Sequence, residues 1–69
     1  MSDSVYKVIE IVGVSEDSWE EATRTAIATA SKSLRDMRIA EVIKLDVTID
    51  SGSVARFRSR LSVSFKYED

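Results

Sequence analysis

Polar and apolar side chains alternate along residues 56–67, and this pattern constrains the fold more than any other feature of the chain. Successive side chains of a β-strand point to opposite faces, so a period of two predicts a strand with one apolar and one polar face. The apolar face would carry Phe57, Leu61, Val63, Phe65 and Tyr67, interrupted by Ser59. The polar face would carry Arg56, Arg58, Arg60, Ser62, Ser64 and Lys66. We expect the first face in a core, with three arginines in line on the other.

Two further segments have the composition of strands. Residues 5–14 are dense in β-branched side chains, and we expect Gly13 to loosen the chain at their end. Residues 38–50 again show a period of two, which would place Ile39, Glu41, Ile43, Leu45, Val47 and Ile49 on one face. The sequence Asp50-Ser51-Gly52-Ser53 supplies turn chemistry, so the last two strands should form a hairpin.

A helix is expected between the first and second strands. Ser18 and Glu21 have the spacing of a capping box, and Ser15 is a competing cap one turn earlier. Apolar residues then recur at helical spacing to about Arg35. Because this apolar stripe is mostly alanine, the helix could lie close to a sheet.

The order strand, helix, strand, strand predicts an α+β fold, β-α-β-β, in one domain covering residues 1–69. A right-handed crossover gives a three-stranded antiparallel sheet of order 1-3-2 that partly wraps the helix. The first strand offers apolar residues to both faces, for example Val8 and Val12 to one and Ile9 and Ile11 to the other. One helix cannot cover both faces, so the second face should meet a partner.

The size of the chain also points to self-association. A domain of 69 residues is marginally stable unless disulfides, a structural metal or oligomerisation support it. The chain contains no cysteine and no histidine, which leaves oligomerisation as the support, most simply with closed symmetry. The competing interpretation is a small dimeric interaction module.

Charge and hydropathy limit the partners. The net charge of −2 argues against general nucleic-acid binding, which favours a basic domain. No apolar run approaches the roughly 20 residues that span a bilayer, and the first residues, MSDS, do not resemble a signal peptide. We expect a cytoplasmic protein with no nucleic-acid and no membrane partner.

Three segments resemble the dodecin family: VYKVIEIVGVSEDSWEEA at residues 5–22, AEVIKLDV at 40–47 and VSFKYED at 63–69. The resemblance covers nearly the whole chain, in the same element order. It implies a hollow homododecamer of cubic symmetry, with helices outside and sheets facing inward. It also implies a shell that binds, stores or buffers a small ligand, for which flavin (FMN, riboflavin or FAD) is the reference.

The flavin-pocket positions that the resemblance implies are Ile39, Glu41, Lys44 and Arg58. Flavin-binding members stack a tryptophan on the ring at the first position and hydrogen-bond it with a glutamine at the last. Isoleucine has no π-face, and arginine donates hydrogen bonds without accepting them. We therefore predict weak or absent flavin binding, as in a branch that lacks the tryptophan and includes a calcium dodecin. Calcium is the alternative ligand, with its metal ligands left open.

The charged residues admit two interpretations each. The arginines at 56, 58 and 60 could bind a phosphate-bearing ligand such as coenzyme A, or form a solvated face paired with Glu10 or Glu41. The carboxylates of Asp36, Glu41, Asp46 and Asp50 could ligate calcium between subunits, or could be plain surface groups.

Trp19 is expected to anchor the start of the helix by packing. Catalysis has little support, because acid–base work without histidine or cysteine would fall to carboxylates or lysines, and no clustered pair stands out. We therefore expect that the protein is not an enzyme.

Overall fold

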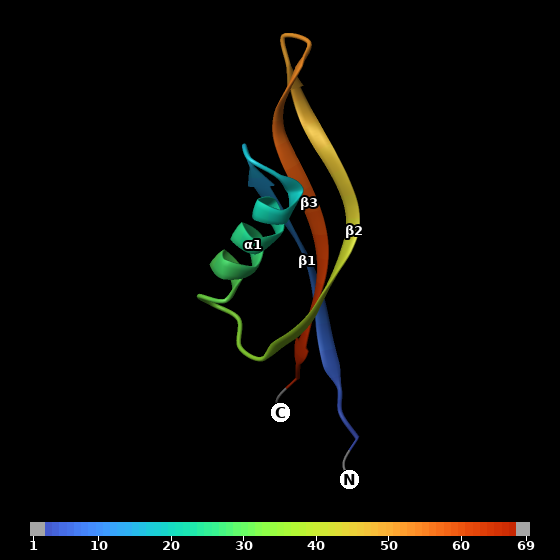
Figure 1. The fold of residues 1–69 in the computed structure, drawn as a ribbon. Helices are drawn as coiled ribbons and strands as arrows, with labels where there is room; N and C mark the ends of the chain where they lie inside the picture. The colour runs from blue at the N-terminus through green and yellow to red at the C-terminus, as the bar shows by residue number, and fades with distance from the viewer. Residues whose placement is uncertain (1–2, 68–69) are drawn as a thin grey trace.

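The computed structural model describes residues 3–67 and contains three strands and one helix (Figure 1). They follow the order β1 (Tyr6–Ser15), α1 (Trp19–Ala30), β2 (Met37–Asp50) and β3 (Ser53–Lys66). β3 lies between β1 and β2 and is antiparallel to both. The predicted fold class and strand order are confirmed. α1 covers one face of the sheet, and the β2–β3 hairpin extends beyond the helix (Figure 1).

The helix begins where the sequence predicts and ends earlier. The Ser18 side chain accepts a hydrogen bond from the Glu21 amide at 3.0 Å, which is one half of the capping box. The predicted end near Arg35 is wrong, because α1 stops at Ala30. Beyond it, the amides of Lys32 and Ser33 bond carbonyls three residues back, a tighter pattern that ends a helix.

Gly13 lies buried inside β1, so the expectation that it loosens the chain at the strand end is wrong. A Cβ atom there would lie 2.0 Å from the Ala22 carbonyl oxygen and 2.8 Å from the Ala26 Cβ. The glycine is therefore needed for the close approach of α1 to β1. The buried helical residues are Ala22 and Ala26, as the alanine stripe predicts.

The core forms between α1 and the predicted apolar face of β3. Leu61, Val63 and Ser59 are fully buried there. Partly buried hydrophobic residues pack around them: Ile9, Ile11, Ile27 and Met37. The Ser59 hydroxyl lies 2.9 Å from the Thr23 hydroxyl, so this buried polar group has a hydrogen-bond partner.

The predicted turn joins β2 to β3. Ser51 and Gly52 have φ angles of 52° and 80°, the left-handed conformation that tight hairpin turns require. Nothing lies within 4 Å of the position that a Cβ would take at Gly52. The glycine at 52 is thus required by backbone conformation, whereas the one at 13 is required by space.

β2 departs from a strict period of two. Its pairing with β3 shifts register between Val42 and Lys44, so Ile43 is an extra residue in the strand. Cross-strand partners share a face. Ile39 and Glu41, opposite Ser64 and Ser62, therefore lie on the other side of the sheet from Leu45 and Val47, opposite Ser59 and Phe57. The prediction that all four share one face is wrong.

Candidate functional site

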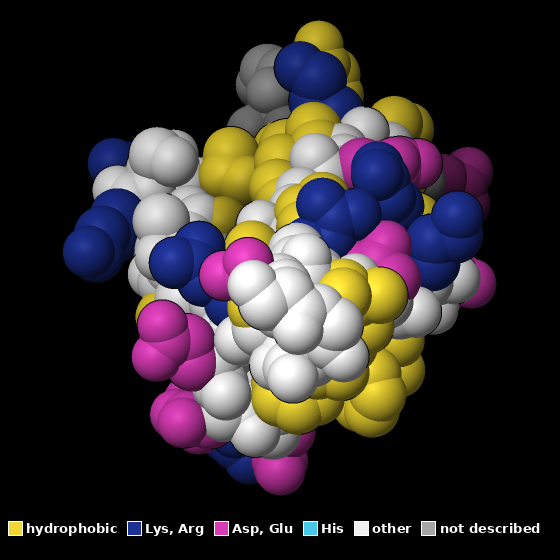
Figure 2. Space-filling model, turned by 90° about the horizontal axis from the view of Figure 1, so that it is seen from above, with side chains coloured by type: hydrophobic (Ala, Val, Ile, Leu, Met, Phe, Trp, Pro, Cys, Tyr) yellow, Lys and Arg dark blue, Asp and Glu magenta, His cyan; other side chains and the backbone are white. Residues whose placement is uncertain are grey.

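The face of the sheet opposite α1, here called the helix-free face, brings the predicted site positions together. Strand register assigns to it Ile39, Glu41, Lys44, Asp46 and Thr48 of β2 and Arg56, Arg58, Arg60, Ser62, Ser64 and Lys66 of β3. It also carries Tyr6, Val8, Glu10, Val12 and Val14 of β1. Seen from above, along the strands, the molecule carries acidic, basic and hydrophobic side chains close together on its surface (Figure 2).

The four positions do not all meet within one chain. Ile39 pairs with Ser64, six residues along β3 from Arg58. At about 3.3 Å per residue, this places the Ile39 and Arg58 positions roughly 20 Å apart. Lys44, opposite Arg60, lies between them with Glu41. The two positions of one chain are therefore too far apart to lie against the same side of one small ring.

Arg58 is held by Asp46. Its Nε atom donates to Asp46 Oδ1 at 2.7 Å and its Nη2 atom donates to Oδ2 at 2.9 Å, a two-pronged arrangement that suits a guanidinium and a carboxylate. The hydrogen bond from Arg58 lowers the pKa of the Asp46 carboxyl, and the same bond raises the pKa of the guanidinium. Sequence reasoning proposed Glu41 or Glu10 as arginine partners and missed Asp46.

A second arginine of the row has a partner on β1. Arg60 Nη1 lies 3.4 Å from Glu10 Oε1, which confirms the predicted cross-strand pairing with Glu10. Glu41 instead lies opposite Ser62. Within the described chain, two of the three arginines thus meet carboxylates, and both pairs remain partly exposed.

Trp19 links the start of α1 to this region. Its indole Nε1 donates to the Asp46 carbonyl oxygen at 3.0 Å. Its ring meets the Phe57 ring edge-on, with centroids 5.1 Å apart and an angle of 73° between the planes. The predicted role as a packing anchor is confirmed, and Asp46 connects Trp19 to Arg58 through its backbone and its side chain.

The predicted calcium carboxylates are spread along the chain. Asp36 lies in the loop before β2, whereas Asp50 ends β2 at the hairpin. Between residues 3 and 67, no group of three or more histidine, cysteine, aspartate or glutamate side chains is arranged to hold a metal ion. Within the same range, no helix is long and apolar enough to cross a membrane.

The family model Dodecin matches residues 5–68 of the chain. The chain belongs to the dodecin family. A calcium dodecin from Mycobacterium tuberculosis is 48% identical over 63 residues, covering 91% of this chain and 89% of the relative. Its crystal structure, described as a calcium chelating antigen with a novel calcium-binding site, superposes with a TM-score of 0.83 at 47% identity, covering 94% and 93% of the two chains.

Other dodecins are similarly close. The Thermus thermophilus dodecin is 38% identical over 65 residues, covering 94% of each chain. The structure of dodecin from Streptomyces coelicolor has a TM-score of 0.93 and 36% identity, covering 100% of this chain and 99% of that one. The resemblance read from the sequence is thus confirmed along the whole described fold.

Proposed function

We propose that this dodecin assembles into a hollow homododecamer that binds a small ligand for storage or buffering and catalyses no reaction. The observation that carries the proposal is the uncovered helix-free face. Val8 and Ile39 on it are 57% and 66% exposed, although both are large hydrophobic residues. Exposed apolar surface of this kind marks a contact with a partner, and a second copy of the chain is the economical partner.

Native mass spectrometry at micromolar concentration tests the assembly. We expect a species of twelve chains. A monomer or dimer under these conditions would contradict the shell and favour the small interaction module.

For the ligand, flavin is the family reference and we propose that it binds weakly here. Ile39 presents an aliphatic side chain at the position implied for the stacking tryptophan, and stacking is a large part of the affinity of a flat ring. Arg58, at the position implied for the glutamine, already donates two hydrogen bonds to Asp46. Both changes remove interactions that a flavin ring would use.

Titration with riboflavin and FMN, followed by flavin fluorescence, tests this proposal. We expect little quenching with the wild-type protein. The double variant Ile39→Trp, Arg58→Gln should bind flavin roughly 10-fold to 100-fold more tightly, if a stacked ring contributes as much as a stacked base. Strong quenching by the wild-type protein would show that Ile39 does not weaken the site.

A matched control keeps the result specific. Ile49, which is 70% exposed near the hairpin turn of β2, lies outside the four pocket positions. The variant Ile49→Trp, Arg58→Gln should gain no affinity. An equal gain would mean that any exposed tryptophan binds flavin.

Calcium is the second candidate, favoured by the 48% identity to a calcium dodecin. Its ligands would be carboxylates such as Glu41 and Asp50 from neighbouring chains, since calcium prefers several oxygen ligands. Equilibrium dialysis of metal-free protein against calcium chloride should show bound calcium, and Glu41→Gln or Asp50→Asn should reduce the amount bound. Absence of bound calcium in the wild-type protein would contradict this candidate and leave flavin or a purely structural shell.

A further inference from the structure

Lys44 and Arg60 lie opposite each other on β2 and β3 of the helix-free face, although both carry a positive charge. Like charges directly opposite each other weaken a sheet. Two carboxylates offset this repulsion: Glu10, which lies 3.4 Å from Arg60, and Asp46, which forms the next cross-strand pair with Arg58. The hydrogen bond from Arg58 lowers the pKa of the Asp46 carboxyl, and the charges of Lys44 and Arg60 act in the same direction. Asp46 thus interacts with three cations.

Two contacts fix the position of Asp46. Its carbonyl oxygen accepts a hydrogen bond from the Trp19 indole at 3.0 Å, which ties this point of β2 to the start of α1. Its carboxylate accepts from Nε and Nη2 of Arg58 at 2.7 and 2.9 Å. Because both the backbone and the side chain are held, the carboxylate stays beside the guanidinium when no ligand is bound.

The ion pair limits what else Arg58 can bind. A guanidinium binds phosphates and carboxylates through paired N–H groups, and Asp46 already occupies the pair formed by Nε and Nη2. An anion on the remaining N–H groups would lie close to the Asp46 carboxylate, and the two negative charges would repel each other. The Arg58 and Asp46 side chains are 40% and 39% exposed, so a small ligand can reach the pair. Arg58 is therefore accessible, but its charge is already neutralised.

We propose that Asp46 is the specificity-determining residue of the helix-free face, because it excludes phosphate-bearing ligands from Lys44, Arg58 and Arg60. This role rests on the proposed ligand-binding function of the same face. Without the Asp46 charge, the three cations would occupy adjacent positions on two neighbouring strands. Such an arrangement suits a diphosphate group, whose oxygens can accept hydrogen bonds from several cations at once. A residue outside the four positions implied for flavin thus decides which ligand charge this face accepts.

Equilibrium dialysis of the assembled protein against inorganic pyrophosphate tests this role. Pyrophosphate carries the charge of the excluded ligands and has no ring, so stacking does not contribute. Asp46→Asn removes the charge and leaves the backbone contact with Trp19 in place. We expect this variant to bind pyrophosphate roughly 10-fold to 100-fold more tightly than the wild-type protein, the effect of a charge-assisted hydrogen bond. Equal affinities would overturn the proposal.

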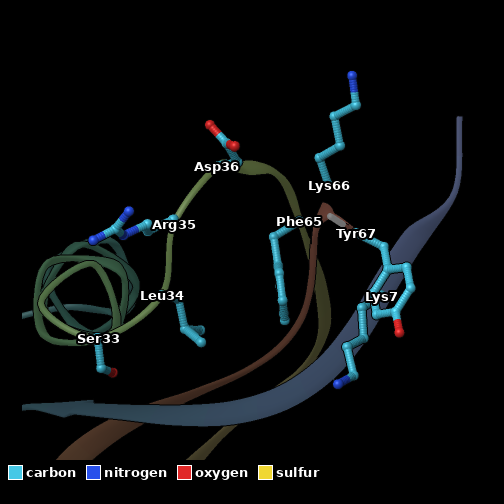
Figure 3. A pocket seen from close by; sticks show the side chains of 8 residues that line it. All are labelled: Lys7, Ser33, Leu34, Arg35, Asp36, Phe65, Lys66 and Tyr67. Carbon is cyan, nitrogen blue, oxygen red and sulfur yellow. The ribbon is translucent and has the colours of Figure 1, made fainter. Parts of the chain in front are cut away.

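The gain must depend on Arg58, because other cations of the chain could also hold pyrophosphate. Lys7, Arg35 and Lys66 line a pocket of about 660 Å³ between the loop that follows α1 and the ends of β1 and β3, and neither Asp46 nor Arg58 lines it (Figure 3). Adding Arg58→Gln to Asp46→Asn should return the affinity to the wild-type level. A gain that survives Arg58→Gln would place the anion elsewhere and overturn the role of Asp46.

Two matched variants separate local exclusion from a change in net charge. Glu20→Gln frees Arg24, its partner at 2.9 Å on the exposed surface of α1, and should leave the affinity for pyrophosphate unchanged. Asp46→Glu keeps the charge of the side chain and should also bind as weakly as the wild-type protein. A gain in Glu20→Gln as large as that in Asp46→Asn would show that net charge alone controls binding. A comparable gain in Asp46→Glu would show that the charge at this position does not exclude the anion.

Light scattering shows whether each variant keeps the wild-type assembly, and Asp46→Ser serves as a second variant without the charge. Failure of the flavin titrations would not affect these results, because pyrophosphate has no ring to stack. Conversely, equal pyrophosphate affinity of the wild-type protein and the variants without the charge would overturn the role of Asp46, while the proposed shell and its flavin or calcium ligand would stand.

Discussion

The two faces of β3 differ in how far residues of the same chain cover them. On the face toward α1, Ser59, Leu61 and Val63 are fully buried by residues of the same chain. On the helix-free face, Arg58 and Arg60 are paired with carboxylates that remain partly exposed, and Ile39 of the neighbouring strand is 66% exposed. The covered face therefore determines the fold of the single chain, whereas the helix-free face is available for contacts with partners.

The first prediction concerns the close approach of α1 to the covered face. Gly13→Ala would place a Cβ 2.0 Å from the Ala22 carbonyl oxygen, a backbone atom that moves only if the helix moves. We expect a loss of free energy of unfolding of about 3 kcal/mol or more, at the upper end of overpacking costs. Urea unfolding followed by circular dichroism, at fixed protein concentration, measures it.

Gly52→Ala is the matched control. It meets no atom within 4 Å but must hold a φ of 80°. The strain of a left-handed alanine should cost about 1 kcal/mol. A Gly13→Ala protein as stable as the Gly52→Ala protein would mean that the close approach of α1 to β1 does not constrain the fold.

The second prediction concerns the helix-free face. Arg58→Glu replaces a guanidinium that lies 2.7 Å from Asp46 with another carboxylate, so two like charges would face each other. If this face is a contact between chains, the dodecamer should dissociate at concentrations where the wild-type protein is intact, while circular dichroism of the secondary structure changes little. Light scattering across a dilution series measures the assembly.

Arg24→Glu makes the same charge reversal on the other side of the molecule. Arg24 lies 2.9 Å from Glu20 on the exposed surface of α1. This variant should keep the wild-type assembly. Equal dissociation of both variants would show that net charge, and not the helix-free face, controls the oligomer.

The third prediction concerns the link between the two faces. Trp19→Phe removes the indole N–H that donates to the Asp46 carbonyl oxygen at 3.0 Å and keeps an aromatic ring near Phe57. We expect a loss of about 1 kcal/mol in the free energy of unfolding, typical of one hydrogen bond. Trp19→Leu should cost about 1 kcal/mol more, because the edge-on ring contact is lost as well. Equal losses in the two variants would leave the ring contact without effect.

The sequence predicts the covered face better than the helix-free face for a physical reason. A period of two identifies strands, and the alanine stripe of the helix identifies its partner surface. Bulges, however, change the face of every residue beyond them, and no period reveals them. Regular pairing from the Asp50–Ser53 turn would place Asp46 opposite Phe57, whereas the shift between Thr48 and Ile49 places it opposite Arg58.

The same bulges explain why the alternating pattern assigns some site residues to the wrong face of the sheet. The resemblance to dodecins supplied Ile39, Glu41, Lys44 and Arg58 as positions, but the alternating pattern put Ile39 and Glu41 on the wrong face relative to Leu45 and Val47. The extra residue at Ile43 restores Ile39 and Glu41 to the face of Arg58. The sequence predicts Asp46 as a calcium ligand or a plain surface carboxylate and not as an arginine partner, because its partner depends on that register.

The smallest expected effect is the pH dependence of the Asp46–Arg58 pair. The hydrogen bond from Arg58 lowers the pKa of the Asp46 carboxyl in the folded chain. The unfolded chain, with its aspartate pKa near about 3.9, then takes up the proton at higher pH than the folded chain does. The contribution of the pair to stability is therefore fully present above about pH 4 and decreases as pH falls through the lowered pKa of the folded state.

Comparison of wild-type protein with Asp46→Asn isolates this contribution, because other carboxyl groups titrate in both proteins. The difference between their urea midpoints should narrow from pH 6 to pH 3, and it should also shrink in about 1 M sodium chloride, because salt screens partly exposed charges. A difference that stays constant over this pH range would show that the charge of Asp46 does not stabilise the fold, because Asp46→Asn leaves the backbone contact with Trp19 in place.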